Sequence, residues 1–460
     1  MKLYRLALAL VIISSLACNT LTRGFADPTP TPFSPATPLP ADTATKNAPV
    51  YIPPECQNIP LATVPAATTL AEPTPQLRGN PEIGQDLQLQ VFDEVVSTIE
   101  EVYVYPDFNG VDWESLASQH RTQIESGLNA EGFYTEMQSL ITELGDEHSS
   151  FESPVEVAEA EAELAGTNDF VGIGIYFLPV LERQRITVLS IFRDSPAEHA
   201  GLKPHDSIIA VDGMPIVQNG EEVSYLVTGP ECSAVVLTVE TPRQAPRELT
   251  LVRTRIQSPS VVDATLLPTS DGSRVGYIFL PTFYDETIPG QVRAALEGFG
   301  TLDGLILDNR VNGGGSSTVL EPVLAYFASG LLGEYTSRHN SRPMEVQPDP
   351  VQNSQTVPLV VLVSEDTVSF GEVFSGVLKD SGRAQVVGES TLGNVEVLHG
   401  YNLADGSRLW IAEETFTPLN SQANWEETGI VPDVQAYADW DTFTFETDPS
   451  IAAALSLLGH

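Results

Sequence analysis

Residues 305–315 read LILDNRVNGGG, an apolar run that passes into a polar loop with three consecutive glycines. A helix fits the next segment, 318–329, so the unit is strand, loop and helix. Further strands are expected at 275–280, 357–363 and 384–388, with another helix at 288–299. The alternation of strands with helices predicts an α/β core that occupies residues 257–460.

The glycine loop is a candidate binding element. Gly313, Gly314 and Gly315 lie where a helix is expected to begin, so the backbone can approach a ligand closely and its N–H groups can face an anion. The pattern predicts an anion or oxyanion cradle, with a flexible turn as the alternative. A phosphate loop is excluded, because no Gly-Lys-Ser/Thr follows.

A second strand-to-helix junction carries a serine. Residues 364–372 read SEDTVSFGE and follow the strand expected at 357–363. Ser369 is expected to be exposed at the C-terminal end of that strand, where the helix dipole and the Phe370 N–H favour negative charge. A serine before a helix is more often only an N-cap, so the position alone is a weak indication of a nucleophile.

Upstream of the core, the sequence changes to strand periodicity. Residues 170–177 and 185–191 are expected strands, and 194–213 read DSPAEHAGLKPHDSIIAVDG. This run resembles a PDZ domain, although His205 stands where most such domains have Gly, in a turn that often requires positive φ. The resemblance implies strand addition of C-terminal peptides. The implied peptide cradle consists of Gly172, Ile173, Gly174 and Ile175.

Three amphipathic helices are expected before this domain, at 87–103, 112–124 and 130–144. Asp112 and Asn129 are the expected N-caps of the second and third helices. Together they predict a small helical bundle. The segment that leaves the bundle, 144–151, reads LGDEHSSF and contains His148.

The N-terminus has the pattern of an export signal. Lys2 and Arg5 precede a short apolar stretch that ends at Cys18, in a sequence that resembles a bacterial lipoprotein box. Lipidation of Cys18 is the favoured interpretation, with plain signal-peptide cleavage as the alternative. Residues 27–76 hold 13 of the 35 prolines and are interpreted as an extended stalk. Cys56 and Cys232 remain, and the sequence leaves open whether they form a disulfide.

The composition excludes several classes of function. The chain has 62 acidic against 22 basic residues, a formal net charge of −40. No surplus of Lys and Arg exists to bind a nucleic-acid backbone or an anionic membrane surface. Three cysteines are too few for a disulfide scaffold or a Cys-rich zinc site, and no metal-ligand spacing is visible.

The order of these elements resembles the C-terminal processing (tail-specific) serine peptidases. The motifs that carry the resemblance are Asp-x-Arg-x-Asn-Gly-Gly-Gly from Asp308, Ser-Phe-Gly-Glu from Ser369, and the segments GESTLG at 388–393 and GIVPD at 429–433. The resemblance implies a ClpP/crotonase-like α/β core with an N-terminal helical bundle and an inserted PDZ domain. It implies that Ser369 is the nucleophile, and that Gly314 or Gly313 and the Phe370 amide form the oxyanion hole.

The implied domain boundaries cover the whole chain. They are a signal peptide at 1–18, a Pro/Thr-rich linker at 19–85, a helical bundle at 86–152, a PDZ domain at 153–256 and the peptidase core at 257–460.

The chain departs from the family at the general base. Ser–Lys members carry the base lysine after the glycine that corresponds to Gly393, and this chain has Asn394 there. Leu398 stands where those members often place a supporting Gln. Asn cannot accept the serine proton, and Lys379 lies ten residues along the helix that follows Ser369, about 15 Å away.

Tricorn-like members of the superfamily use Ser, His and Glu instead. His148 stands in the position of their histidine, and Glu426 stands a few residues before the Gly-Ile-Val-Pro-Asp turn, where their glutamate lies. A neutral His is a good base near pH 7, and a carboxylate fixes its tautomer. The alternatives are that His148 only caps a loop, and that Glu427 replaces Glu426. The other histidines are interpreted as decoys or surface positions: His120, His199, His205, His339, His399 and His460.

The sequence therefore predicts a serine endopeptidase of exported polypeptides, which recognises free C-termini and uses neither metal nor cofactor. It is expected to act outside the cytoplasm and to contact a membrane only through a lipid at Cys18. One alternative is a catalytically inactive PDZ-containing binding protein of the same fold, a fold that also occurs in the ligand-carrying interphotoreceptor retinoid-binding protein. The other is an enzyme that acts on non-protein esters.

Overall fold

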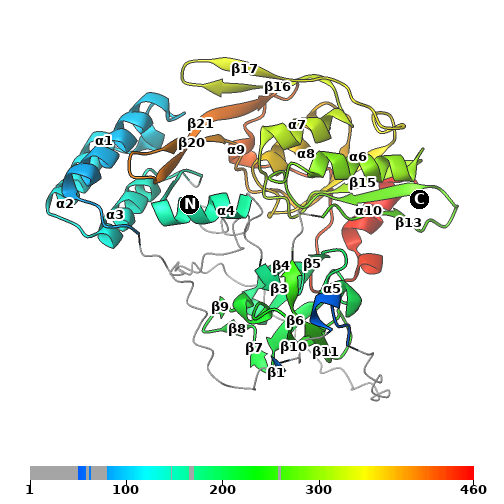
Figure 1. Cartoon of the computed structure of the whole chain (residues 1–460). Coiled ribbons are helices and arrows are strands. Elements are labelled where there is room, and N and C mark those ends of the chain that lie inside the picture. Colours follow the sequence, from blue (N-terminus) through cyan, green and yellow to red (C-terminus); the bar gives the residue numbers. More distant parts are fainter. Residues whose placement is uncertain (1–49, 58–61, 64–79, 147, 165–169, 257–260) are drawn as a thin grey trace, which may run out of the picture.

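The computed structural model describes residues 50–57, 62–63, 80–146, 148–164, 170–256 and 261–460. Cys18, the predicted leader and most of the proline-rich segment lie outside these residues. Within the described ranges, no helix is both long and apolar enough to cross a bilayer. Figure 1 shows a helical unit, a small β unit and a larger α/β unit.

The α/β unit is built on a six-stranded sheet with the order β13-β14-β15-β18-β19-β22. The first pair is antiparallel and the remaining pairs are parallel. The strands are β13 (Ala264–Leu267), β14 (Val275–Phe279), β15 (Gly304–Asp308), β18 (Leu359–Val363), β19 (Gln385–Gly388) and β22 (Val434–Gln435). Every residue of β14, β15 and β18 is buried, as expected for parallel strands covered on both faces.

Helices cover the two faces of this sheet. The helices α6 (Ile288–Phe299), α7 (Ser317–Ala325) and α8 (Phe370–Asp380) share one hydrophobic core with Leu305 and Leu307 of β15. The helix α10 (Pro449–Leu458) packs on the opposite face with Ile306. Alternate residues of β15 therefore face different helices, which is the side-chain period of a strand.

The small β unit contains a seven-stranded sheet with the main order β1-β10-β6-β5-β4, to which β11 and β7 are added. The strands and helix are β1 (Ala62–Thr63), β4 (Ile175–Val180), β5 (Arg185–Ile191), α5 (Pro196–His199), β6 (Ser207–Val211), β7 (Met214–Pro215), β10 (Ser233–Glu240) and β11 (Arg247–Val252). Two short pairs complete the unit: β3 (Phe170–Gly172) with β12 (Thr254–Ile256), and β8 (Val217–Gln218) with β9 (Glu221–Glu222). The predicted positive φ at His205 is confirmed at 72°.

The helical unit contains the three predicted helices, α1 (Gln85–Val102), α2 (Trp113–Glu125) and α3 (Ala130–Glu143), followed by α4 (Pro154–Leu164). Both predicted N-caps are confirmed: the Asp112 side chain accepts from the Ser115 N–H, and the Asn129 side chain accepts from the Gly132 N–H. Helix α7 is shorter than the expected 318–329, because the chain turns after Ala325 toward the next strand, which begins at Gly330.

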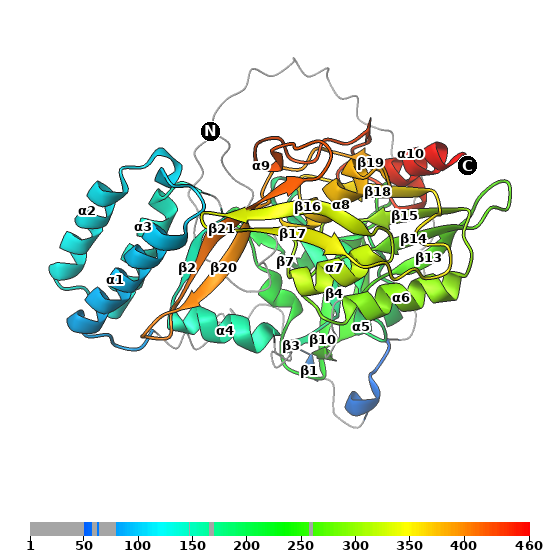
Figure 2. The same cartoon turned by 90° about the horizontal axis from the view of Figure 1, so that it is seen from above.

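A second sheet, which was not predicted from the sequence, joins the helical unit to the α/β unit. Its order is β17-β16-β21-β2, and β20 also pairs with β21. The members are β2 (Ser150–Glu152), β16 (Gly330–Ser337), β17 (Ser341–Val346), β20 (Val397–Asn402) and β21 (Arg408–Pro418), followed by the short α9 (Trp425–Thr428). Leu409, Ile411 and Ala412 of β21 complete the hydrophobic core of the helices. Figures 1 and 2 both show β20 and β21 between the helices and the α/β unit.

A disulfide between Cys56 and Cys232 attaches the N-terminal segment to the small β unit. This settles the pairing that the sequence left open. Beside it, the Glu55 carboxylate accepts from the Thr254 hydroxyl, and β1 pairs in parallel with β10. The bond closes a loop of 176 residues, so it removes considerable entropy from the unfolded chain.

We expect reduction of this disulfide to lower the melting temperature, because loss of a native cross-link typically costs about 2–5 kcal/mol. The measurement is thermal unfolding with and without a reductant, for the wild type and for the double variant Cys56→Ser, Cys232→Ser. The double variant should melt at the temperature of the reduced protein and should not respond to reductant. A wild-type melting curve that is insensitive to reductant would contradict the assignment.

Candidate active site

Ser369 lies at the junction between β18 and α8, as the N-cap of the helix. Its backbone has φ 54° and ψ −127°, a region that non-glycine residues rarely adopt. Such a conformation costs about 1–3 kcal/mol and persists only where the surrounding structure enforces it. A sharp turn of this kind between a strand and a helix presents the serine hydroxyl at the end of the sheet.

The buried carboxylate of Glu372 enforces this turn. It accepts hydrogen bonds from the Ser369 N–H (3.2 Å), the Thr391 hydroxyl, and the N–H groups of Gly393 (2.9 Å) and Asn394 (2.8 Å). Glu372 is fully buried, and burial raises its pKa despite these four donors.

The glycine loop faces the serine. A Cβ on Gly314 would lie 2.7 Å from Ser369 Cβ and 2.9 Å from the Phe370 amide nitrogen. Gly314 has φ +90°, and its N–H donates to Asn312 Oδ1 at 2.9 Å. The sequence-predicted residues Gly314, Ser369 and Phe370 are therefore brought together. In this conformation the Gly314 N–H is directed to Asn312.

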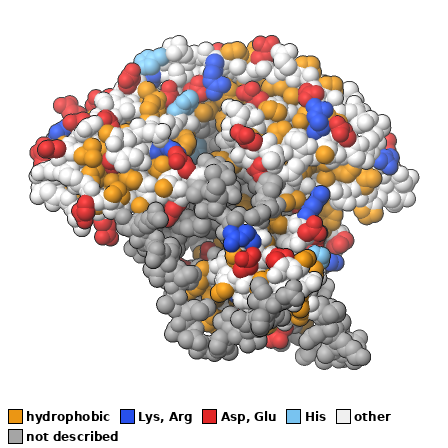
Figure 3. All heavy atoms as spheres, viewed as in Figure 1, with side chains coloured by type: hydrophobic (Ala, Val, Ile, Leu, Met, Phe, Trp, Pro, Cys, Tyr) orange, Lys and Arg blue, Asp and Glu red, His pale blue; other side chains and the backbone are white. Residues whose placement is uncertain are grey.

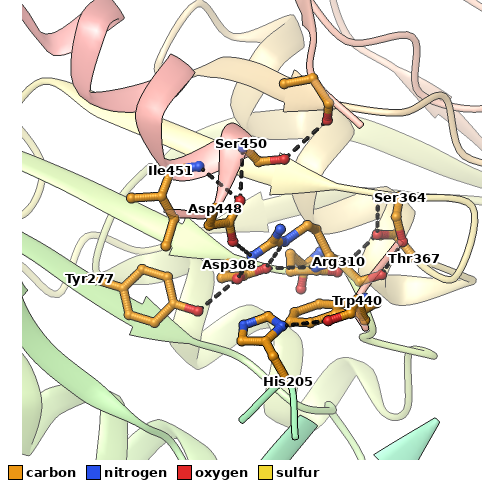
Figure 4. A network of polar contacts seen from close by, with 12 residues as sticks. His205, Tyr277, Asp308, Arg310, Ser364, Thr367, Trp440, Asp448, Ser450 and Ile451 are labelled. Carbon is orange, nitrogen blue, oxygen red and sulfur yellow. Dashed lines mark hydrogen bonds and ion pairs between the residues drawn. The ribbon is translucent and has the colours of Figure 1, made fainter. Parts of the chain in front are cut away.

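A buried arginine holds the base of the glycine loop, as Figure 4 shows. The Arg310 guanidinium pairs with Asp308 and with Asp448, the N-cap of α10, at 2.7 Å. It also lies 4.5 Å from the centre of the Trp440 ring. Loss of one partner of such a pair typically costs about 3–5 kcal/mol, because the remaining charge is buried without compensation.

His205 connects the small β unit to the contacts around Arg310, because it lies against Trp440. Its Nδ1 lies 2.9 Å from the Trp440 carbonyl oxygen, and its ring stacks on Trp440. Burial lowers the pKa of His205 to about 4, so the ring is neutral at pH 7. The interpretation of His205 and His120 as surface residues was wrong, since their exposed fractions are 2% and 6%. His120 lies instead between α2 and α3, with Nδ1 2.7 Å from Glu136.

His148 lies in the loop between α3 and β2, and Asp146 shapes that loop. Asp146 Oδ1 accepts from the N–H groups of His148 (3.1 Å) and Ser149 (2.5 Å). The Ser149 hydroxyl in turn accepts from the Ala412 N–H of β21. Only 9% of His148 is exposed. Within the described residues its Nε2 has no hydrogen-bond partner, so the bond to Ser369 is not made in this structure.

The carboxylate beside His148 is Glu396. Its Oε2 lies 2.7 Å from His148 Nδ1, although the ring N–H does not point straight at the oxygen. Its Oε1 accepts from the Tyr105 hydroxyl at 2.6 Å. Glu426, the predicted partner of His148, lies next to Glu396, with a polar atom within 4.8 Å of it, and its Oε2 accepts from the Val395 N–H at 2.8 Å. Glu396 was not predicted from the sequence, where its signal is an acidic residue inside the apolar run VEVL at 395–398.

Comparison with known proteins identifies the units. Family models match residues 274–436 (Peptidase family S41), 187–241 (PDZ domain) and 88–141 (Tricorn protease C1 domain). A carboxyl-terminal-processing protease of Synechocystis sp. is 30% identical over 372 residues, which cover 78% of this chain and 84% of that protein. The chain belongs to the carboxyl-terminal-processing proteases of peptidase family S41.

Two further relatives agree. A chloroplastic C-terminal processing peptidase of Tetradesmus obliquus is 29% identical over 75% of this chain and 76% of its own. The solved structure of the photosystem II D1 C-terminal processing protease superposes with a TM-score of 0.53 at 25% identity, and the match covers 81% of this chain and 97% of that one. The family assignment made from the motifs is thus confirmed.

In this S41 protease, Asn394 is the residue that the motifs predict at the position of the family lysine. It is buried, and its N–H is bound to Glu372. Lys379 lies 2.8 Å from Asp433 and donates to the Val431 carbonyl oxygen, so it is directed away from Ser369. His399 lies 3.5 Å from Glu414, on an exposed part of β20.

The PDZ domain of this protease places the predicted peptide cradle at the start of an edge strand. Gly172 pairs with Thr254 of β12, and the Ile173 carbonyl oxygen accepts from the Ala197 N–H. Gly174 has φ +80° and packs against Ser195. Ile175 begins β4, which pairs with β5 on one side and ends the order of the sheet.

Acidic side chains are spread over the face of the protease that Figure 3 shows. Few Lys and Arg side chains lie among them on this face. This distribution agrees with a general effect on solubility rather than with a binding patch of one charge.

We expect Gly314→Ala to lower kcat/KM by about 100-fold or more, the size of effect typical when an oxyanion donor is displaced. The added methyl would collide with Ser369 and the Phe370 amide, and alanine is strained at φ +90°. The measurement is cleavage of a peptide substrate, with thermal unfolding to verify that the variant folds. Gly290→Ala is the matched control, because a Cβ there meets nothing within 4 Å. Equal activity of the two variants would contradict the proximity of the loop to the serine.

Proposed function

We propose that the protein is an exported, tail-specific serine endopeptidase in which Ser369 is the nucleophile and His148 the general base. The observation that carries this proposal is the backbone of Ser369, held at positive φ between the glycine loop and the start of α8. Family membership supports the reaction class, and the crotonase-like core is the fold that the family resemblance implies. The short contact of His148 with Glu396 supports the choice of base.

The proposed reaction follows the general scheme for serine hydrolysis. His148 Nε2 accepts the Ser369 proton as the hydroxyl attacks the peptide carbonyl, and the imidazolium then protonates the leaving amine. Water resolves the acyl-enzyme with His148 again as the base. The Ser369–His148 hydrogen bond forms when substrate closes the site, as catalytic bonds that are absent from a free enzyme often do.

Backbone amides at the start of α8 are the proposed oxyanion donors. The Phe370 N–H begins the helix, where the dipole favours negative charge. Gly313 and Gly314 supply the second donor. Because the Gly314 N–H is bound to Asn312 here, its participation requires that bond to be shared with the oxyanion or exchanged for it.

The PDZ domain is proposed to bind the free C-terminus of the substrate. A peptide can add to the outer edge of β4, and the cradle at Gly172, Ile173 and Gly174 precedes that strand. Contacts of His205 with Trp440 connect the domain to the loop that carries Arg310.

Export is supported by the leader pattern, by Cys18 as a lipidation site and by the disulfide. A disulfide persists in oxidising compartments and is rare in the cytosol. The proline-rich segment would then hold the protease away from the membrane, and polypeptides outside the cytoplasm are its proposed substrates.

We expect a fluorophosphonate probe to label the wild type and to fail on Ser369→Ala. We also expect His148→Ala to lower kcat by about 10,000-fold or more, because the proton then has no acceptor. His399→Ala is the matched control, since His399 is exposed on β20, and it should retain activity. A wild type that is not labelled would favour the inactive binding protein. Labelling without peptide cleavage would favour the esterase.

We expect a substrate with a free C-terminus to be cleaved at a lower KM than the same peptide with a C-terminal amide, because the amide lacks the charge that a backbone cradle binds. The measurement compares both peptides with the wild type and with Gly174→Val, whose side chain would collide with Ser195. The variant should lose the discrimination, and a folding control by thermal unfolding accompanies it. Equal KM values for both peptides with the wild type would contradict PDZ recognition of C-termini.

A further inference from the structure

Two glutamate side chains lie together behind His148. One polar atom of each of His148, Glu396 and Glu426 lies within 4.8 Å of the other two, so the two carboxyl groups are direct neighbours. The Glu396 side chain is only 4% exposed. Two carboxyl groups can form a direct hydrogen bond only if one of them carries a proton, since both are acceptors when ionised.

The donors around the pair indicate which group carries the proton. Each oxygen of Glu396 already meets another donor, the Tyr105 hydroxyl at Oε1 and His148 Nδ1 at Oε2. Glu426 receives a single backbone donor, the Val395 N–H at Oε2. Glu396 is therefore the better-stabilised carboxylate. A proton on Glu426 would allow that group to donate a hydrogen bond to Glu396.

The surroundings make a second negative charge expensive. The other titratable groups that face the pair are Tyr103, Tyr105, Asp146 and Glu372, besides His148. Burial raises the pKa of both tyrosines, so they stay neutral donors, while Asp146 and Glu372 add to the negative potential. Ionisation of Glu426 would place a further charge beside these carboxylates.

A metal ion is not required to explain the contact. Two nitrogen or oxygen ligands of a tetrahedral zinc ion lie about 3.3 Å apart. The 2.7 Å separation between His148 Nδ1 and Glu396 Oε2 is shorter and corresponds to a direct contact between the imidazole and the carboxylate.

We propose that Glu396 is the carboxylate that positions His148, and that Glu426 is a neutral carboxylic acid that donates a hydrogen bond to Glu396. This inference rests on the proposed function, because it gives His148 its orientation for proton transfer. Glu426 then acts one step away from the histidine. The Val395 N–H donates a hydrogen bond to Glu426, which fixes the backbone next to Glu396. Glu426 therefore acts both on the Glu396 carboxylate and on the backbone beside it.

The electrostatics agree with this division. Burial and the neighbouring Glu396 raise the pKa of Glu426 to about 9. Burial would also raise the pKa of Glu396, but the hydrogen bonds from His148, Glu426 and Tyr105 outweigh it and lower that pKa to about 2. Glu426 is thus protonated at pH 7 and ionises only as the pH rises through about 9, where the contact between the carboxyl groups is lost.

The first test compares amide variants by kinetics. Glu396→Gln removes the charge that fixes the histidine tautomer, and we expect kcat to fall by about 10,000-fold with little change in KM. Glu426→Ala should lower kcat by about 100-fold, and Glu426→Gln should recover most of that loss, because its amide can donate to Glu396 and accept from Val395. Glu345→Gln, exposed on β17, controls for a general effect of lost charge. Thermal unfolding verifies that each variant folds.

The pH profile separates positioning from a merely structural role. Wild-type kcat should fall as the pH rises through about 9, whereas Glu426→Gln, which cannot ionise, should lack that alkaline limb. A loss in Glu426→Gln as large as that in Glu396→Gln would overturn the inference and make Glu426 the ionised partner of His148.

The second test needs no activity. It compares the infrared spectrum of Ser369→Ala at pH 7 with that of the same protein carrying Glu426→Gln in addition. The difference should contain the C=O stretch of a protonated carboxylic acid, and this band should disappear above about pH 9. Absence of the band would overturn the inference, even in an active enzyme. If the band is present but the wild type is not labelled by fluorophosphonate, the proposed function is overturned. The inference that Glu426 carries a proton would then still hold.

Discussion

The buried carboxylate of Glu372 is the constraint on which the site depends. It joins the strained turn at Ser369 to the loop 391–394, and it does so with four hydrogen bonds inside the protein, where an unpaired carboxylate would be costly. The same loop leads within two residues to Glu396. One buried group thus sets both the conformation of the proposed nucleophile and the approach of the carboxylate that orients the proposed base.

The site is assembled from three parts of the chain that are remote from one another in sequence. Ser369 comes from the parallel sheet, His148 from the exit of the helical unit, and Glu396 from the segment that enters β20. The antiparallel sheet β17-β16-β21-β2 brings the last two together, since β2 and β20 both pair with β21. The hairpin β20–β21 also completes the core of the helices, so the stability of the helical unit and the position of His148 depend on the same packing.

We infer from the motifs that Asn394 stands where Ser–Lys members carry their base lysine, and this difference bears on the electrostatics of the region. A lysine would supply a positive charge close to Glu372 and Glu396, whereas here His148 is the basic group beside them. Several carboxyl groups then share a small volume, and a retained proton relieves their repulsion. The proposed general base and the protonated Glu426 are in this sense two consequences of one substitution.

The sequence by itself determined the elements that depend on local chemistry and periodicity. Helices α1 to α3, the caps Asp112 and Asn129, the strands β14, β15, β18 and β19 and the positive φ at His205 all follow from residues that are near one another in the chain. The sequence also predicted Ser369, Gly314 and Phe370 as site residues, because each family motif is a run of neighbouring residues. Only the tertiary structure decided the antiparallel sheet around β21, the Cys56–Cys232 bond, the burial of His205 and the contact of His148 with Glu396 rather than directly with Glu426. Each of these depends on contacts between residues tens to hundreds of positions apart, whose free energy comes from packing and desolvation that no local pattern encodes.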